Sequence, residues 1–308
     1  MSEPVMTPQP ARPEQRNGIL IGPSGLRAGW RLLIFVAIVF VLLTIVGAVA
    51  PQILIMMSKG FSPRNVILQD VALFAIIAIA TAIMGRIEGR GFGEYGLPAT
   101  GLLGRQFWMG AAWGFVMLSA IVGMMLATHS YEIDGLAISM AKVIRYGFLW
   151  AIAFLLVGFF EEFTFRGYLL YTLTTGIGFW PAAVISCVLF AGGHLGNPGE
   201  NLVGVSEIVL IAVFLCLALR RTGSLWFAIG WHMSFDWGES FFYSTPNSGI
   251  PAIGHMLKAS LMGSKWLSGG SVGPEASVFD LVVTIAGILL LLKVYPEAKY
   301  PAMANVQN

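Results

Sequence analysis

The sequence has little charge for its length. Aspartate, glutamate, lysine and arginine make up 11% of the 308 residues, against about 25% in an ordinary soluble domain. Hydrophobic residues make up 56%, and they form long blocks with almost no charge rather than stripes with the period of a strand or a surface helix. This composition disfavours a soluble domain, and a net charge of +2 with no basic patch gives no reason to expect nucleic acid as a partner.

Cysteine, cleavage signals and repeats are also scarce. The two cysteines, Cys187 and Cys216, fall inside apolar blocks, where a thiol is a small packing group rather than half of a disulfide. No small-residue cleavage pattern follows the first apolar block, which argues against a removable signal peptide. No internal repeat or second domain is visible, so one domain is expected.

The apolar blocks predict transmembrane helices. Crossing a bilayer takes about 20 apolar residues in a helix, and only helices or closed barrels satisfy the backbone in lipid. Barrel strands would be shorter and would alternate in polarity, which these blocks do not do. We therefore predict an all-α, polytopic membrane protein with about eight transmembrane helices, the fifth and sixth of them short. The predicted helices are Leu32–Ala50, Val66–Met84, Phe107–Ala127, Tyr146–Thr172, Trp180–Ala191, Ser206–Leu219, Leu225–Phe241 and Val278–Val294.

These helices define one transmembrane domain over residues 31–295, between a flexible polar N-terminal tail at 1–30 and a C-terminal tail at 296–308. If the N-terminus is inside, eleven lysines and arginines fall on the inner side and six on the outer side, with Arg166 set aside within the membrane. Because basic residues are enriched on the cytoplasmic side, we expect a multi-pass protein of the cell (plasma or inner) membrane with both termini in the cytoplasm.

The fourth predicted helix carries two glutamates and an arginine. A charge at the centre of a membrane helix costs roughly 2.5 to 3.5 kcal/mol, so each is a candidate for function. Glu162 and Arg166 are four residues apart, share a helix face and can neutralise each other. Glu161 points about 100° away from that pair and lacks a local counter-ion, which makes it the candidate general base.

A histidine on the fifth helix is predicted to face Glu161. Residues 176–181 form a glycine- and proline-containing turn between the fourth and fifth helices, which predicts an antiparallel hairpin. The midpoint of 161 and 194 falls inside this turn, so Glu161 and His194 are expected at the same depth. They can therefore hold one water molecule between them.

The seventh helix carries a second histidine. His232 and Asp236 are four apart and share a face, with Glu239 one turn further. A second histidine at such a site can polarise a scissile carbonyl and stabilise the oxyanion, which gives a hydrolase site between the fourth, fifth and seventh helices. Two histidines with carboxylates also suit zinc, with His194 and His232 as ligands, so a metal-assisted reaction stays open.

These three clusters resemble the signature of the CAAX prenyl protease and bacteriocin-processing membrane proteins (type II CAAX protease-like). That signature has a Glu-Glu-x-x-x-Arg, a Phe-x-x-x-His and a His-x-x-x-Asn/Asp motif on successive membrane helices, and all three are present here in order. The likeness also reaches residues 29–31, 94–98 and 223–226. It implies an intramembrane endopeptidase that acts in the bilayer on a membrane-embedded or lipidated protein.

By this resemblance, Glu161 is the catalytic carboxylate and His194 its partner in activating water. His232 and Asp236 form the oxyanion site or a metal sphere, and Glu162 and Arg166 support them. Asp236 stands where eukaryotic relatives carry asparagine, and an ionised aspartate cannot donate to an oxyanion. No His-Glu-x-x-His zinc motif is present.

Two other interpretations stay open. A proton-coupled transporter would also need buried carboxylates, and Asp70, Glu207 and Asp280 could extend such a path, although each is expected near a helix end where water reaches it. A non-catalytic scaffold or immunity protein would keep the fold without the reaction.

Two glycine patterns need no catalytic role. Residues 269–273 fit Gly-x-Ser-x-Gly, but no strand is predicted before them, so we interpret 244–277 as a long outer loop, partly a lid over the site. The Gly-x-x-x-Gly pattern at Gly110 and Gly114 indicates close helix packing.

Overall fold

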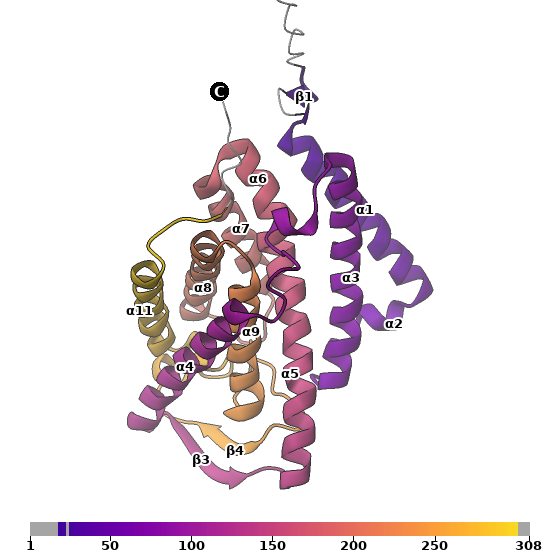
Figure 1. Cartoon of the computed structure of the whole chain (residues 1–308). Coiled ribbons are helices and arrows are strands. Elements are labelled where there is room, and N and C mark those ends of the chain that lie inside the picture. Colours follow the sequence, from indigo (N-terminus) through magenta and orange to yellow (C-terminus); the bar gives the residue numbers. More distant parts are fainter. Residues whose placement is uncertain (1–17, 23–24, 301–308) are drawn as a thin grey trace, which may run out of the picture.

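The computed structural model describes residues 18–22 and 25–300, and it is helical throughout its body (Figure 1). This confirms the all-α, polytopic membrane fold. The long elements, in chain order, are α1 (Ala28–Val49), α3 (Pro63–Glu88), α4 (Arg105–Ala127), α5 (Met140–Glu162), α6 (Leu169–Ile177), α7 (Phe179–His194), α8 (Leu202–Thr222), α9 (Trp226–Trp237) and α11 (Val278–Val294). The short elements are β1 (Ile21–Gly22), β2 (Gly25–Leu26), α2 (Pro51–Leu54), β3 (Tyr131–Leu136), β4 (Leu257–Leu261) and α10 (Lys265–Ser268), with single 3-10 turns at Met57–Lys59, Phe92–Tyr95 and Pro274–Ala276.

All eight predicted segments are helical, but the helices differ in length. Within the described residues, five stretches are long and apolar enough to cross a membrane, namely α1, α3, α4, the continuous stretch Met140–Ile177 and α8. The sixth predicted helix is therefore longer than expected, since α8 has 21 residues. Helix α7 has 16 residues and α9 has 12, so they are the short elements of the bundle.

The predicted tails lie partly outside the described residues, which leave out 1–17 and 301–308. At the N-terminal side, β1 pairs with β2 in an antiparallel hairpin, and α1 begins at Ala28, inside the segment predicted as tail. The domain boundaries at 31 and 295 stay predictions.

The fourth predicted helix is not one regular α-helix. Helix α5 ends at Glu162, Phe163–Tyr168 is a π-helical segment, and α6 follows. Gly167 has the non-helical ψ of −114°, and a side chain there would clash with the Phe163 ring. Such π segments are rare and occur mostly at functional sites.

Close packing of α4 on α9 fixes the helix that carries His232. A Cβ added at Gly110 would clash with the carbonyl oxygen of Phe227, and one added at Gly114 with that of Trp231. The absence of side chains at these two positions lets the backbones approach, as small residues do between membrane helices. The predicted role of the Gly-x-x-x-Gly pattern is confirmed.

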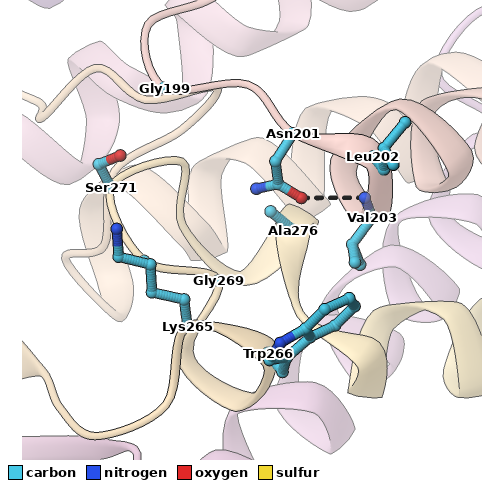
Figure 2. A pocket seen from close by; sticks show the side chains of 10 residues that line it. Gly199, Asn201, Leu202, Val203, Lys265, Trp266, Gly269, Ser271 and Ala276 are labelled. Atoms are coloured by element: carbon cyan, nitrogen blue, oxygen red, sulfur yellow. Dashed lines mark hydrogen bonds between the residues drawn. The ribbon is translucent and has the colours of Figure 1, made fainter.

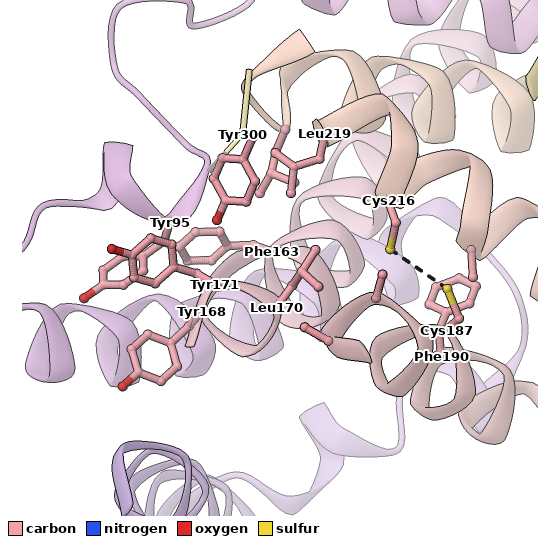
Figure 3. Packing of buried hydrophobic residues seen from close by; sticks show 14 of the residues in the cluster. Tyr95, Phe163, Tyr168, Leu170, Tyr171, Cys187, Phe190, Cys216, Leu219 and Tyr300 are labelled. Atoms are coloured by element: carbon pink, nitrogen blue, oxygen red, sulfur yellow. Dashed lines mark hydrogen bonds between the residues drawn. The ribbon is translucent and has the colours of Figure 1, made fainter. Parts of the chain in front are cut away.

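An aromatic core lies at the end of the bundle where α6 turns into α7. Figure 3 shows Tyr95, Tyr168, Tyr171 and Tyr300 gathered from three separate segments, and all four are buried. In the same cluster Cys187 and Cys216 are free thiols whose sulfur atoms lie 4.0 Å apart, which agrees with the predicted packing role.

The two ends of the described chain meet at this same end of the bundle. The backbone amide of Tyr300 donates to the Arg220 carbonyl, and Arg31 of α1 donates to Thr175 at the end of α6. Strands β3 and β4 pair antiparallel at the opposite end (Figure 1).

Candidate active site

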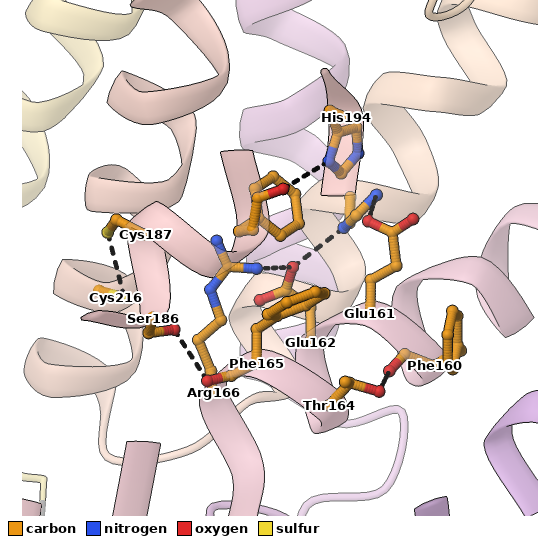
Figure 4. A network of polar contacts seen from close by, with 12 residues as sticks. Phe160, Glu161, Glu162, Thr164, Phe165, Arg166, Ser186, Cys187, His194 and Cys216 are labelled. Atoms are coloured by element: carbon orange, nitrogen blue, oxygen red, sulfur yellow. Dashed lines mark hydrogen bonds and ion pairs between the residues drawn. The ribbon is translucent and has the colours of Figure 1, made fainter. Parts of the chain in front are cut away.

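Glu162 and Arg166 form the predicted ion pair. Arg166 Nη1 lies 3.2 Å from Glu162 Oε1, and both side chains have no exposed surface. The guanidinium also lies 4.2 Å above the Phe190 ring of α7, and Ser186 of α7 donates to the carbonyl of Phe165. The pair therefore ties the π segment to α7 (Figure 4).

Glu161 faces away from this pair, as expected from its place on the helix. Its Oε2 is buried without a hydrogen-bond partner, and its nearest cationic group is Nε2 of His232, 3.6 Å away. That distance is too long for a hydrogen bond. The oxygen thus has an unused capacity to accept a hydrogen bond.

His232 lies at the centre of the site. Its Nδ1 lies 3.0 Å from Glu162 Oε1, within hydrogen-bond distance, and its Nε2 lies 3.5 Å from Asp236 Oδ2. The predicted shared face of His232 and Asp236 is confirmed. Because Glu162 occupies one ring nitrogen, it fixes the ring with Nε2 directed between Glu161 and Asp236.

His194 ends α7 and lines the same cavity as Glu161. The turn at Gly178, where φ is +82°, connects α6 to α7, as the glycine-rich segment predicted. The Phe190 carbonyl lies 2.8 Å from His194 Nδ1 and orients the ring. In the described part of the chain no hydrogen bond or ion pair joins His194 to Glu161 directly, so the two can meet only through a molecule in the cavity.

The cavity has a volume of about 270 Å³ and a mixed wall. Phenylalanines make up much of its apolar part, and its polar part contains all four predicted catalytic residues. The wall includes the residues used in the argument below, namely Phe61, Asp70, Phe154, Phe160, Glu161, Phe190, His194, His232, Asp236, Asn247, Ser248 and Glu275. Supporting residues Glu162 and Arg166 lie behind this wall, and Glu239 is completely buried and outside it.

Three wall residues were not predicted. Asp70 was expected near a helix end in contact with water, but it lies within α3 and is 4% exposed, because α3 packs along α5 and turns this face inward. The same expectation is wrong for Glu207 and Asp280, which are fully buried. Asn247 and Glu275 belong to the loop after α9, and nothing in their local sequence pattern indicates a place in the site.

This loop covers part of the cavity, which agrees with the predicted lid. The backbone amide of Ser248 donates to Glu275 Oε2 at 2.6 Å, and the Asn247 side-chain amide donates to Glu239 Oε2 at 3.1 Å. Burial raises the pKa of Glu275, while the Ser248 hydrogen bonds and nearby His194 act in the opposite direction. Glu239, directly after α9, therefore anchors the loop, and Glu275 joins two parts of the loop to each other.

A second cavity of about 400 Å³ lies beside the loop and contains Ser271 (Figure 2). Ser271 lies in a turn between α10 and the 3-10 turn before α11, and the element directly before it is the helix α10, since β4 already ends at Leu261. A serine nucleophile elbow needs a strand-to-helix turn. The interpretation of residues 269–273 as a loop is confirmed.

The geometry does not fit the zinc alternative. Zinc binds nitrogen and oxygen ligands at about 2.0 to 2.2 Å in sites with three or four protein ligands. Across residues 18–22 and 25–300, no group of three histidine, cysteine, aspartate or glutamate side chains could hold a metal ion. Carboxyl groups share the cavity with His194 and His232, but none of them completes a three-ligand group with these histidines in the described part of the chain.

Comparisons with known proteins agree with the resemblance. Residues 143–238 match the family model described as type II CAAX prenyl endopeptidase Rce1-like. The matched segment begins in α5 and ends just after α9, so it contains every predicted catalytic residue. It supports a CAAX-type endopeptidase of the membrane in general. A comparison with curated proteins finds no match.

Proposed function

We propose that this protein is an intramembrane endopeptidase that hydrolyses a peptide bond in a membrane-embedded or lipidated protein by means of water activated at Glu161. The observation that carries this proposal is the buried Oε2 of Glu161, which has no hydrogen-bond partner and lies 3.6 Å from His232 Nε2 in the wall of a cavity. A polar atom left unpaired inside a membrane protein is costly, and a ligand that fills the cavity would pair it.

Glu161 acts as the general base. A water molecule in the cavity gives a proton to its carboxylate while the water oxygen bonds to the scissile carbonyl carbon. His194, from the opposite helix of the hairpin, positions that water. The two residues thus hold the nucleophilic water from two sides.

His232 stabilises the oxyanion. With Nδ1–H donating to Glu162, a doubly protonated His232 donates from Nε2 toward the developing charge. Asp236, 3.5 Å from Nε2, favours that charged imidazolium but cannot itself donate when ionised. Asn247 carries an amide in the same wall and could take the place of the asparagine of the eukaryotic relatives.

The apolar wall suits an apolar substrate. Phe61, Phe154, Phe160 and Phe190 line the cavity, and the outer faces of the helices expose large apolar side chains such as Phe40 and Val49 of α1. Both features fit a substrate that arrives through the bilayer. Neither feature supports the transporter alternative. Transporters are commonly built from two related halves, and the sequence shows no such repeat.

The proposal is tested with purified protein in liposomes. The probe is a fluorogenic peptide that ends in a farnesylated cysteine and three further residues, and wild type is compared with Glu161→Ala and His194→Ala, each with and without a chelator. Glu132→Ala and His255→Ala are matched controls, since both lie outside the cavity wall. We expect cleavage to be lost in the first two variants and kept in the controls.

Cleavage that survives in both site variants would remove the assignment. Loss of wild-type cleavage on chelation would restore the metal-assisted alternative. A proton flux in sealed vesicles that Glu161→Ala abolishes, without any peptide cleavage, would favour the transporter.

A further inference from the structure

Asp70 is a buried acid in the site that the mechanism above does not use. It lies in α3, lines the cavity and is 4% exposed. One of its carboxyl oxygens, Oδ2, is buried and has no hydrogen-bond partner. A buried, unpartnered carboxyl group directed into a cavity is unfavourable unless a ligand or a proton compensates it.

The groups that face Asp70 include another acid. Asp70 interacts electrostatically with Glu161 of α5 and with His232 of α9. The same cavity contains Asp236 of α9, His194 of α7 and Glu275 of the loop. Four carboxyl groups thus share the cavity with two histidines, whereas the one arginine close by, Arg166, is already paired with Glu162.

Two carboxylates close together in a water-poor site repel each other strongly. A state with one carboxylate and one carboxylic acid is therefore favoured over two charges, as in other enzymes with paired acidic groups. His232 Nε2 lies 3.6 Å from Glu161 Oε2, whereas Asp70 forms no ion pair with a basic side chain among the described residues. Asp70 is then the group that keeps the proton.

The reaction needs such a proton. Collapse of the tetrahedral intermediate breaks the C–N bond and leaves the electron pair on nitrogen, and an amine leaves readily only when an acid protonates it. From this juxtaposition we infer that Asp70 is the general acid of the site, which gives its proton to the leaving amine. The proton that Glu161 has taken from water then passes to Asp70, so both groups return to their starting states.

This inference rests on the proposed endopeptidase function. Two substrates with different leaving groups allow the inference and the function to be tested separately. An amide leaving group needs a proton, whereas 4-nitrophenolate departs without one. The test therefore measures kcat and KM of Asp70→Asn in liposomes, on the farnesylated peptide and on the 4-nitrophenyl ester of the same acyl segment. We expect a loss of about 10²-fold in kcat on the peptide, an unchanged KM, and near wild-type turnover of the ester.

The controls separate this role from a structural one. Glu161→Gln should lose both substrates, because both need an activated water. Glu207→Gln removes a fully buried carboxyl group outside the cavity wall and should keep both. If Asp70→Asn does not fold, Asp70→Glu replaces it, and its peptide-to-ester ratio should stay close to that of wild type.

Equal losses on peptide and ester, or no loss on either, would overturn the role of Asp70 and leave the endopeptidase intact. Ester and peptide cleavage that both survive Glu161→Gln would overturn the proposed function and the inference with it.

Discussion

Two buried ionic clusters in this protein differ in how completely they are paired. Near the end where α6 turns into α7, Arg31 of α1 contacts Glu88 of α3 at 2.7 Å, and Tyr168 donates to the same carboxylate at 2.5 Å. In the cavity, the contacts of His232 Nε2 with Glu161 and Asp236 are 3.6 and 3.5 Å. The first cluster connects helices through short contacts, and the second leaves a gap.

The difference indicates what each cluster does. A membrane interior penalises every unpaired charge. A cluster in which each charge has a partner therefore stabilises the fold. A cluster whose ionic contacts are as long as those of His232 Nε2 with Glu161 and Asp236 is less stable than it could be. That deficit is typical of a site in which a ligand completes the pairing.

The largest expected effect on stability distinguishes Glu162 from its neighbour Glu161. Glu162→Gln leaves Arg166, which has no exposed surface, without a counter-ion, and breaking one partner of a buried pair costs about 3 to 5 kcal/mol. Thermal unfolding in detergent should show this loss, whereas Glu161→Gln should unfold near the wild-type temperature. If the two variants were equally stable, the division between a structural and a reactive glutamate would be wrong.

A smaller effect is expected in the paired cluster. Arg31→Met removes the 2.7 Å contact to Glu88 and hydrogen bonds to Thr172 and Thr175, which should cost about 1.5 to 3 kcal/mol. Turnover per folded molecule should not change, because the cluster lies outside the cavity wall. The control is Arg90→Met, whose side chain is 34% exposed and lies 3.7 Å from Glu88, so its loss should stay below about 1 kcal/mol. A fall in kcat for Arg31→Met would show that the two clusters are coupled.

The smallest effect is a pH dependence at the loop. Burial raises the pKa of Glu275 in the folded protein, so the folded state binds this proton more tightly than the unfolded state. The resulting stabilisation is present at low pH and is lost as the pH rises from the unfolded value through the folded one. Glu275→Gln keeps the shape and removes the titration, so its unfolding temperature relative to wild type should increase from pH 4.5 upward. A difference between the two proteins that does not vary with pH would contradict this.

The predictable part of the site is local in sequence. Residues four apart on a helix share a face whatever surrounds them, so the pairs of Glu162 with Arg166 and of His232 with Asp236 follow from spacing. The glycine turn likewise brings α7 back against α6, which places His194 near Glu161. Asp70 was misplaced because position along a helix does not show which neighbour covers it.

The sequence by itself determined the membrane fold, the positions of its helices and the spacing of the candidate acidic and histidine residues along them. Length, apolarity and spacing are properties of a single segment, and the bilayer leaves helices as the way to satisfy such a backbone. The tertiary structure decided which of those groups meet. It brought Asp70 into the same cavity wall as Glu161 and added Asn247 and Glu275 from the loop. Contacts between distant segments depend on how whole helices pack, and no local pattern specifies them.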